Sequence, residues 1–276
     1  GVLGNQNIGE TYRYPGYPAL SSSGSAVFGD NIITGYGLEY LVSPGLNWEK
    51  TYSWEVGFEM NLLRNRLRIE PVYYSKETKD MLAIVEGIAG TTPGLANLGA
   101  IQNKGFELSA SWNDRLQNGF SYGLSANLTT IDNKVKSLIN KDYAICAGTG
   151  SISRTAEGFP IGYFFGYEVE GVYQNQEDIK QSPTNTLASV LPGDLKFRDV
   201  NGDGEITAAD RTMIGNPTPD FTYGFSLQLG YKNFDLTADF MGVYGNEIYR
   251  TWDNNNFAQF NYLADRQNRW HGEGTS

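Results

Sequence analysis

Several long stretches of alternating apolar and polar residues constrain the fold of this chain most strongly. In residues 120–129 every second side chain is apolar, and the side chains between are small or polar. The same period of two recurs in residues 53–60, 106–112, 221–229 and 234–240. A period of two places one kind of side chain on each face of a β-strand. The chain is therefore predicted to be all-β.

Strand length and turn spacing distinguish a membrane barrel from a β-sandwich, which also contains alternating strands. The predicted strands run about 9 to 12 residues, as tilted membrane-crossing strands require, whereas strands of ordinary sheets have about 5 to 6. Short turns are predicted at 63–65, 113–119 and 230–233, and long connections at 76–103 and 131–219. Short turns at one end and long loops at the other are typical of outer-membrane barrels. We therefore expect a transmembrane antiparallel β-barrel portion whose apolar face meets lipid and whose polar face lines the lumen.

The same reasoning divides the chain into four regions. They are an extracellular loop and strand region leading into the barrel (1–50), barrel strands with an extracellular loop at about 76–103 (51–130), a long extracellular excursion (131–219), and barrel strands with the start of the next extracellular loop (220–276). Aromatic residues close to predicted strand ends are candidates for the girdles at the lipid headgroups, with ordinary core packing as the alternative. These residues are Trp54, Tyr73, Tyr74 and Trp112.

Residues 199–210 fit a calcium loop of the D-x-[DN]-x-[DN]-G type, with Asp in place of Glu at the twelfth position. The candidate Ca²⁺ ligands are the side chains of Asp199, Asn201 and Asp203, the carbonyl of Glu205, the hydroxyl of Thr207 or a water on it, and the closing carboxylate of Asp210. Proline-containing segments flank this loop where an EF-hand has helices, so we predict a lone calcium loop that stiffens a connection. The alternative is a loop whose Asx side chains only cap their own backbone. The same excursion is predicted to contain the start of a helical turn at 176–178 and a short helix at 207–214 with Thr207 as its N-cap.

Composition and residue inventory argue against nucleic-acid binding and against catalysis. The net charge is −10 and the isoelectric point about 4.7, whereas phosphate backbones are bound by clustered Lys and Arg. His271 is the only histidine, and the lone Cys146 allows no internal disulfide. Glu168 and Glu170 share a predicted strand face, but nothing in the sequence fixes their separation for glycoside hydrolysis. We therefore expect a protein that is not an enzyme.

A series of short motifs resembles the SusC/RagA group of TonB-dependent outer-membrane transporters of Bacteroidetes. In chain order, the series lies at 47–51, 65–82, 97–108, 162–167, 192–204, 214–224 and 269–276. The resemblance implies a barrel of about 22 strands with a plugged lumen. It also implies import of glycans or peptides across the outer membrane of a Gram-negative bacterium, energy from TonB, and a SusD-like surface lipoprotein as partner.

The chain departs from that family in having no plug domain, no TonB box and too few strands for a closed barrel of this size. We therefore expect it to be a barrel piece of a longer polypeptide, which contacts TonB through the missing N-terminal part. The alternative function is a soluble, calcium-stabilised carbohydrate-binding module of a secreted complex. In that alternative the same apolar strand faces form the core of a sandwich.

Overall fold

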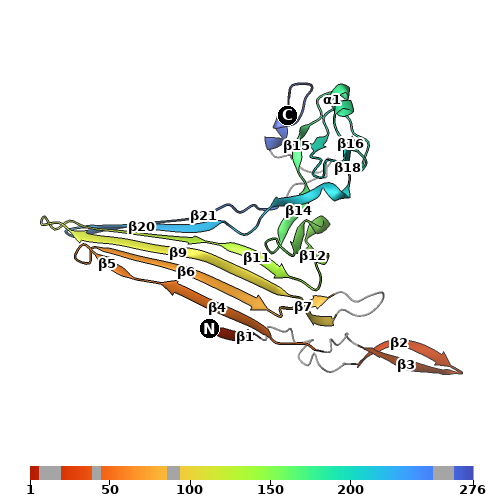
Figure 1. The fold of residues 1–276 in the computed structure, drawn as a ribbon, viewed down its shortest axis with the longest axis horizontal. Coiled ribbons are helices and arrows are strands. Elements are labelled where there is room, and N and C mark those ends of the chain that lie inside the picture. The colour runs from red at the N-terminus through yellow and green to blue at the C-terminus, as the bar shows by residue number, and fades with distance from the viewer. Residues whose placement is uncertain (6–19, 39–44, 86–93, 251–263, 276) are drawn as a thin grey trace. The chain divides into compact units, whose positions relative to one another are not determined.

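The computed structural model describes residues 1–5, 20–38, 45–85, 94–250 and 264–275. The chain divides into two compact units. The first contains residues 1–144, 156–161 and 220–244, and the second contains 145–155, 162–219 and 245–276. Because the positions of the parts relative to one another are not determined, each unit is described by itself (Figure 1).

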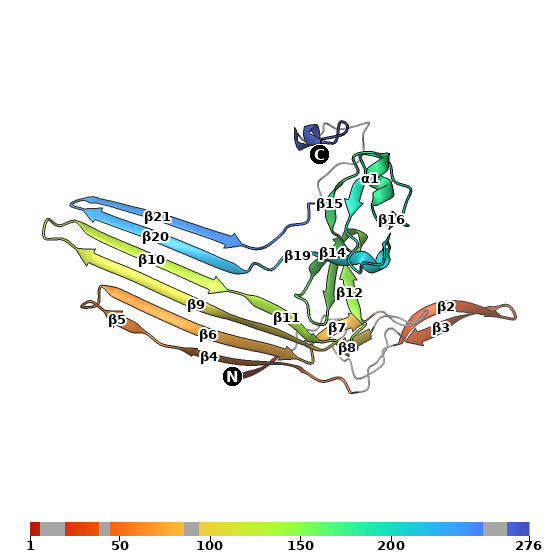
Figure 2. The same cartoon turned by 45° about the horizontal axis from the view of Figure 1, so that its top comes forward.

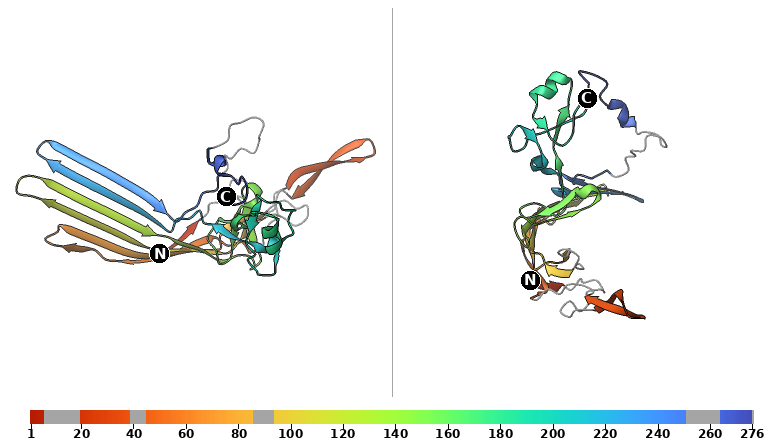
Figure 3. Two further views of the ribbon diagram at one scale, coloured as in Figure 1. Left: turned by 90° about the horizontal axis from the view of Figure 1, so that it is seen from above. Right: turned by 90° about the vertical axis from the view of Figure 1, so that its right-hand side faces the viewer.

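The first unit is built on an antiparallel nine-stranded sheet. Its strands are β1 (Val2–Asn5), β4 (Glu49–Gly57), β5 (Met60–Leu62), β6 (Leu67–Lys79), β9 (Ala100–Arg115), β10 (Ser121–Thr130), β11 (Asp132–Ser137), β20 (Phe221–Tyr231) and β21 (Phe234–Tyr244). The order is β1-β4-β6-β9-β10-β20-β21, with β5 paired to β6 and β11 paired to β9. The long strands therefore lie side by side in chain order (Figure 2). The sheet forms a single curved layer (Figure 3).

The pairing register aligns the alternating residues into rows across the sheet. One face carries apolar rows such as Ile69–Ala110–Ala126–Phe225–Phe240 and Pro71–Leu108–Leu128–Tyr223–Gly242. The other face carries polar rows such as Arg68–Ser111–Ser125–Ser226–Asp239. A slip of one residue would exchange the two faces, so the alternation and the register specify each other. The prediction of strands with one apolar and one polar face is confirmed.

The connections at the two ends of this sheet differ in length, as predicted. At one end β5 and β6 are joined through residues 63–66, and β20 and β21 through only Lys232 and Asn233. Residues 63–65 all have positive φ, from 54° to 63°, which gives the tight reversal between β5 and β6. At the other end, long segments separate β6 from β9 and β10 from β20.

Several strands continue past the limits that alternation predicts. β6 ends at Lys79 and β9 begins at Ala100, so the predicted loop at 76–103 is shorter in the structure. It contains the hairpin of β7 (Leu82–Val85) and β8 (Gly94–Asn97). The predicted excursion at 131–219 likewise begins with β11 on β9. Near several strand ends, polar residues occupy both faces of the strand. The alternation of apolar and polar residues therefore stops there, although the backbone hydrogen bonds of the strand continue.

A small hydrophobic core lies at this loop end of the sheet. Ile101, Val135 and Leu138 are between 0% and 8% exposed, and Met81 and Tyr143 pack against them. Ile101 and Val135 are paired across β9 and β11. A separate hairpin in the first unit consists of β2 (Leu20–Phe28) and β3 (Asn31–Leu38). Of the predicted region 1–50, residues 6–19 and 39–44 lie outside the described residues.

The second unit consists of short elements. Its strands are β12 (Ala144–Ala147), β13 (Ser153–Ala156), β14 (Tyr163–Tyr167), β15 (Val169–Val172), β16 (Thr184–Asn185), β17 (Leu195–Phe197), β18 (Glu205–Ile206) and β19 (Arg211–Gly215). Its helices are α1 (Gln176–Gln181) and 3-10 helices at Thr149–Ser151, Ala208–Asp210 and Ala264–Asn268. The sheets are β12-β13-β14-β19, β15-β17 and the parallel pair β16-β18. Within the predicted region 220–276, residues 251–263 and 276 are not among those described.

Two local predictions in the second unit have different outcomes. The predicted helical turn at 176–178 is confirmed as the start of α1, which Asn175 caps by accepting a hydrogen bond from the Asp178 amide. The predicted helix at 207–214 is wrong beyond residue 210. A 3-10 helix ends at Asp210, and residues 211–215 form β19 because they pair with β14. Tertiary pairing thus overrides the local helix-start signal.

No helix in the described ranges has both the length and the apolar character needed to cross a bilayer.

Candidate functional site: the two faces of the sheet and the loop at residues 199–210

The apolar face of the nine-stranded sheet is exposed. Trp54, Phe240 and Leu236 are 54%, 61% and 57% exposed, and Phe225 on β20 is 38% exposed. Five successive outward positions on β20, from residue 221 to 229, cover about 27 Å along the strand. A tilted strand of this length matches the apolar band of an outer-membrane barrel. A sandwich would bury these side chains, so the structure favours lipid as their environment.

Aromatic residues mark the loop end of this apolar band. The Trp54 and Tyr73 rings lie with their centroids 5.6 Å apart, and Tyr73 is paired across strands with Val56 and Phe106. Tyr74 follows Tyr73 in β6 and therefore points to the opposite face, where its hydroxyl donates to the Thr130 carbonyl at 3.3 Å. Trp54 and Tyr73 thus fit the predicted girdle, and Tyr74 does not.

The polar face carries charged and amide groups that interact with one another. Arg68 forms an ion pair with Glu59 at 3.2 Å and a second ion pair with Glu70. The Asn133 amide donates to the side-chain oxygen of Asn103 at 2.7 Å. This polar surface is suited to water, polar cargo or another polar protein segment, and not to lipid.

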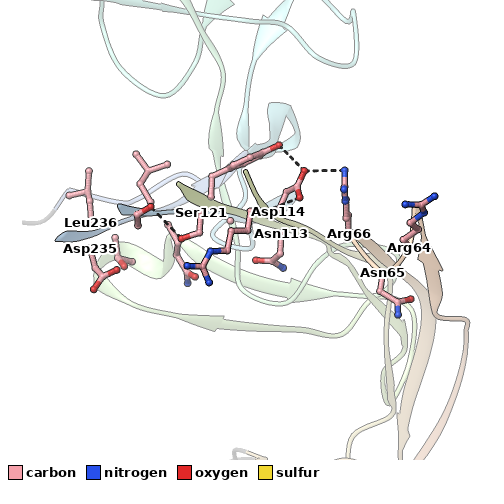
Figure 4. Close-up of a pocket in the computed structure, with 15 residues that line it drawn as sticks. Arg64, Asn65, Arg66, Asn113, Asp114, Ser121, Asp235 and Leu236 are labelled. Carbon is pink, nitrogen blue, oxygen red and sulfur yellow. Dashed lines mark hydrogen bonds and ion pairs between the residues drawn. The ribbon is translucent and has the colours of Figure 1, made fainter. Parts of the chain in front are cut away.

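A pocket of ≈ 730 Å³ lies at the short-turn end of the sheet (Figure 4). Its lining includes Arg64, Arg66 and Arg115 as well as Asp114 and Asp235. Arg66 forms an ion pair with Asp114 at 3.1 Å, and the hydroxyl of Tyr122 donates to the same carboxylate at 3.4 Å. The sequence does not predict this pocket, because its residues come from one turn and from the ends of four strands that only the sheet register brings together.

The loop at 199–210 is closed on itself by its last residue. Asp210 is completely buried, and its carboxylate accepts hydrogen bonds from the amides of Val200 at 3.0 Å and Thr207 at 2.7 Å. The backbone N–H of Thr207 contributes most to a pKa of Asp210 below its ordinary value. Asp210 therefore joins the end of the loop to its beginning.

The other side chains predicted to bind calcium accept hydrogen bonds from amides of the loop. Asp199 accepts from Gly202 at 2.6 Å and from Gly204 at 2.8 Å. Asn201 accepts from the Asp203 amide, and Asp203 accepts from the Glu205 amide, both at 2.9 Å. In the described part of the chain, no three Asp, Glu, His or Cys side chains gather as a metal-binding group. Calcium binding at this loop therefore stays a prediction.

Two of the residues considered for catalysis, Glu168 and His271, have structural partners. Glu168 forms an ion pair with Arg198 at 3.1 Å, and a ring nitrogen of His271 lies 3.0 Å from the Gln267 carbonyl oxygen. Cys146 is exposed. None of these contacts forms a nucleophile–base pair of the kind used in hydrolysis.

An ion pair in the second unit predicts acid sensitivity. The Lys196 ammonium lies 2.9 Å from Asp178 and holds the pKa of that carboxyl below its ordinary value, and the Gln174 amide lowers it further. Because the folded pKa is depressed, this contribution to stability is complete above the ordinary aspartate pKa of about 3.9 and is lost as pH falls further. We expect hydrogen exchange near α1, corrected for its intrinsic pH dependence, to accelerate below that pH.

The matched variant for this test is Asp178→Asn. It removes the titrating group, so its exchange near α1 should be faster than that of the parent at neutral pH and should change less between pH 5 and pH 3. Equal pH dependence in the parent and in the variant would contradict the assignment to Asp178.

Comparison with known proteins agrees with this architecture. The family model described as TonB dependent receptor-like, beta-barrel, matches residues 6–152, which is more than half of the chain. TonB-dependent receptor P3 of Formosa agariphila is 32% identical over 284 residues, covering 96% of this chain and 28% of that protein. TonB-dependent receptor SusC of Bacteroides thetaiotaomicron is 28% identical, covering 90% and 25%.

Solved structures show the same fold. The RagAB peptide transporter structure aligns with a TM-score of 0.68 at 23% sequence identity, covering 89% of this chain and 25% of that chain. This chain spans about a quarter of the length of the curated relatives that it matches. With an exposed apolar face, a polar face and a matching family model, the chain belongs to the TonB-dependent receptor β-barrel family of Gram-negative outer-membrane proteins.

Proposed function

We propose that this chain forms part of the barrel wall and of the surface loops of a longer TonB-dependent importer. The importer carries glycans or peptides across the outer membrane together with a SusD-like surface lipoprotein. Its energy comes from TonB, which acts on parts of the protein other than the residues described here. The protein acts as a transporter and not as an enzyme.

The observation that supports this proposal most strongly is the two-faced sheet. Its apolar rows are exposed, and its polar rows carry interacting ionic and amide side chains. A wall between lipid and a watery lumen requires this division. The peptide class is suggested by the RagAB peptide transporter, whose structure is similar to this chain, and the glycan class by the resemblance to the SusC/RagA group.

Uptake by cells that carry or lack the full-length protein tests the proposal. Labelled oligosaccharides and peptides are supplied separately, with and without dissipation of the proton gradient that energises TonB. We expect one of the two classes to accumulate only in cells that have the protein and an intact gradient. Equal accumulation of both classes with and without the protein would contradict import.

We also propose that the loop at 199–210 binds Ca²⁺. The support is the ligand spacing in the sequence together with the closure of the loop by Asp210, whose carboxylate accepts hydrogen bonds from the amides of Val200 and Asn201 near the start of the loop. The side chains of Asp199, Asn201 and Asp203 would then bind Ca²⁺. To do so, their oxygens would give up the hydrogen bonds that they accept from loop amides. On the extracellular side, even a weak site of millimolar affinity can be occupied.

Asp203→Ala tests the calcium proposal. We expect the variant to lose bound Ca²⁺ and to show faster hydrogen exchange in residues 190–215, with the barrel strands unaffected. Glu177→Ala is the matched control, because Glu177 is a carboxylate of the same unit outside this loop. Unchanged calcium content in Asp203→Ala, measured by isothermal titration and by metal analysis, would refute the assignment.

A further inference from the structure

Lysines are concentrated on the outward face of the sheet just beyond the apolar band. On β9, Lys104 is the first outward residue after Phe106, and on β4, Lys50 follows Trp54 and Tyr52 on the same face. Lys79 is paired across strands with Lys50, and Lys134 is paired with Gln102, which neighbours Lys104 on that face. The four lysines therefore come from four adjacent strands at the same end of the sheet.

The opposite side of the strands at this level is closed. Thr51, Ile101 and Val135 alternate with the lysines and are 9%, 4% and 0% exposed. The side chains of Lys79 and Lys104 are 51% and 43% exposed. The lysines consequently face the outside of the sheet, on the same side as the apolar rows.

The positive charges of this cluster exceed the nearby negative charges. Lys104 forms an ion pair with Asp132 at 3.1 Å, and Lys79 lies 3.8 Å from Glu77. Among the described residues, Lys50 and Lys134 form no ion pair. In the part of the chain that the structure describes, two of the four lysines therefore have no carboxylate within ion-pair distance, although the whole sequence carries a net charge of −10.

The pairing of Lys50 with Lys79 is unfavourable by itself. Like charges directly opposite each other on neighbouring strands destabilise a sheet. The Lys79 ammonium lies 5.3 Å from the centroid of the Tyr52 ring, which offsets part of this repulsion. An anion between the two ammonium groups would remove the rest.

We propose that Lys50, Lys79, Lys104 and Lys134 bind phosphate groups on the headgroups of outer-leaflet lipid. This inference rests on the proposed function, because it requires the apolar rows to lie in the bilayer. The lysines lie within one to three outward positions of the aromatic end of the band, and each outward step is about 7 Å along the strand. Headgroup phosphates lie at this level, and long lysine stems can reach them from either side.

The test uses the full-length receptor in phosphatidylcholine nanodiscs. The discs contain either diphosphorylated lipid A or the same lipid after removal of both phosphates, and native mass spectrometry counts the lipid that stays bound. We expect the parent to retain the phosphorylated lipid preferentially. The quadruple variant K50Q/K79Q/K104Q/K134Q should lose that preference by about fivefold per lysine. The double variant K50Q/K79Q should show an intermediate loss, which keeps the test valid if the quadruple variant assembles poorly.

The control variant K76Q/K141Q/K180Q/K232Q removes four charges from other positions and should retain the phosphorylated lipid as the parent does. Equal retention of both lipids by the parent, or equal loss in the control variant, would overturn the inference. Complete displacement of the lipid by millimolar inorganic phosphate would also overturn it, because the site would then recognise free phosphate. Failure of the parent to insert into the discs would refute the proposed function, whereas insertion without phosphate preference would refute only the lysine site.

Discussion

Replacing Phe225 with Arg is expected to destabilise the assembled barrel by about 2–4 kcal/mol, the cost of a cation on the lipid face near the middle of a membrane strand. Phe225 lies at the centre of the five outward positions of β20 and is paired with Ala126 and Phe240. Among the described residues, the cross-strand row that contains Phe225 has no carboxylate that could pair with the new Arg. The free energy of unfolding in denaturant, measured on the full-length protein in lipid vesicles, gives the size of the effect.

The matched control is the next residue of the same strand. Ser226 faces the polar side and is paired with Ser125 and Asp239. Ser226→Arg should change stability by less than about 1 kcal/mol, because the new guanidinium can meet water or Asp239. Phe225→Leu preserves an apolar side chain and should stay close to the parent. Equal destabilisation by the two Arg substitutions would contradict the assignment of the faces.

Ile206→Ala is expected to cost the second unit about 2–5 kcal/mol, the range for removing a fully buried aliphatic side chain. Ile206 is 0% exposed, and its carbonyl accepts hydrogen bonds from the amide and the hydroxyl of Thr186 at 3.1 and 2.8 Å. Its backbone thus pairs β18, which lies within the loop at 199–210, with β16, and its side chain is completely buried at this pair. Local hydrogen exchange in residues 184–206 measures the loss.

Two controls refine this prediction. Ile206→Val removes one methylene group and should cost about 0.5–1.5 kcal/mol. Val200→Ala changes a residue of the same loop that is 45% exposed, and it should have little effect. If Val200→Ala accelerated hydrogen exchange as much as Ile206→Ala, burial of the Ile206 side chain could not be the cause of the stability of residues 184–206.

The sequence predicts the membrane part of the sheet well because each strand there faces two different environments. Phe225 and Ser226 belong to opposite faces in the sequence pattern and in the structure alike. The extent of β6 and β9 could not be predicted, since beyond Tyr73 and Phe106 polar residues occur on both faces. Hydrogen bonds between backbones, which carry no side-chain signature, extend those strands.

The candidate sites were predictable only in part for similar reasons. The spacing of acidic residues identified the loop at 199–210, but the sequence did not show that Asp210 is fully buried and bonded to the amides of Val200 and Thr207. Arg211 to Gly215 follow a clear helix-start signal and nevertheless form a strand, because β14 offers an edge for pairing. The lysine cluster required the register, since its members are distant in sequence.

A label scan along β20 shows directly which face of the sheet meets lipid. In the full-length protein with Cys146, the lone cysteine of this sequence, changed to serine, a nitroxide is attached in turn to single cysteines at positions 222–229. Collision rates with lipid-soluble oxygen and with a water-soluble nickel chelate are then measured in a bilayer. For a lipid-facing wall we expect a period of two in these collision rates, with oxygen favoured at odd positions and the chelate at even positions. Absence of alternation, or water access at Phe225 and Leu227, would contradict a lipid-facing barrel wall.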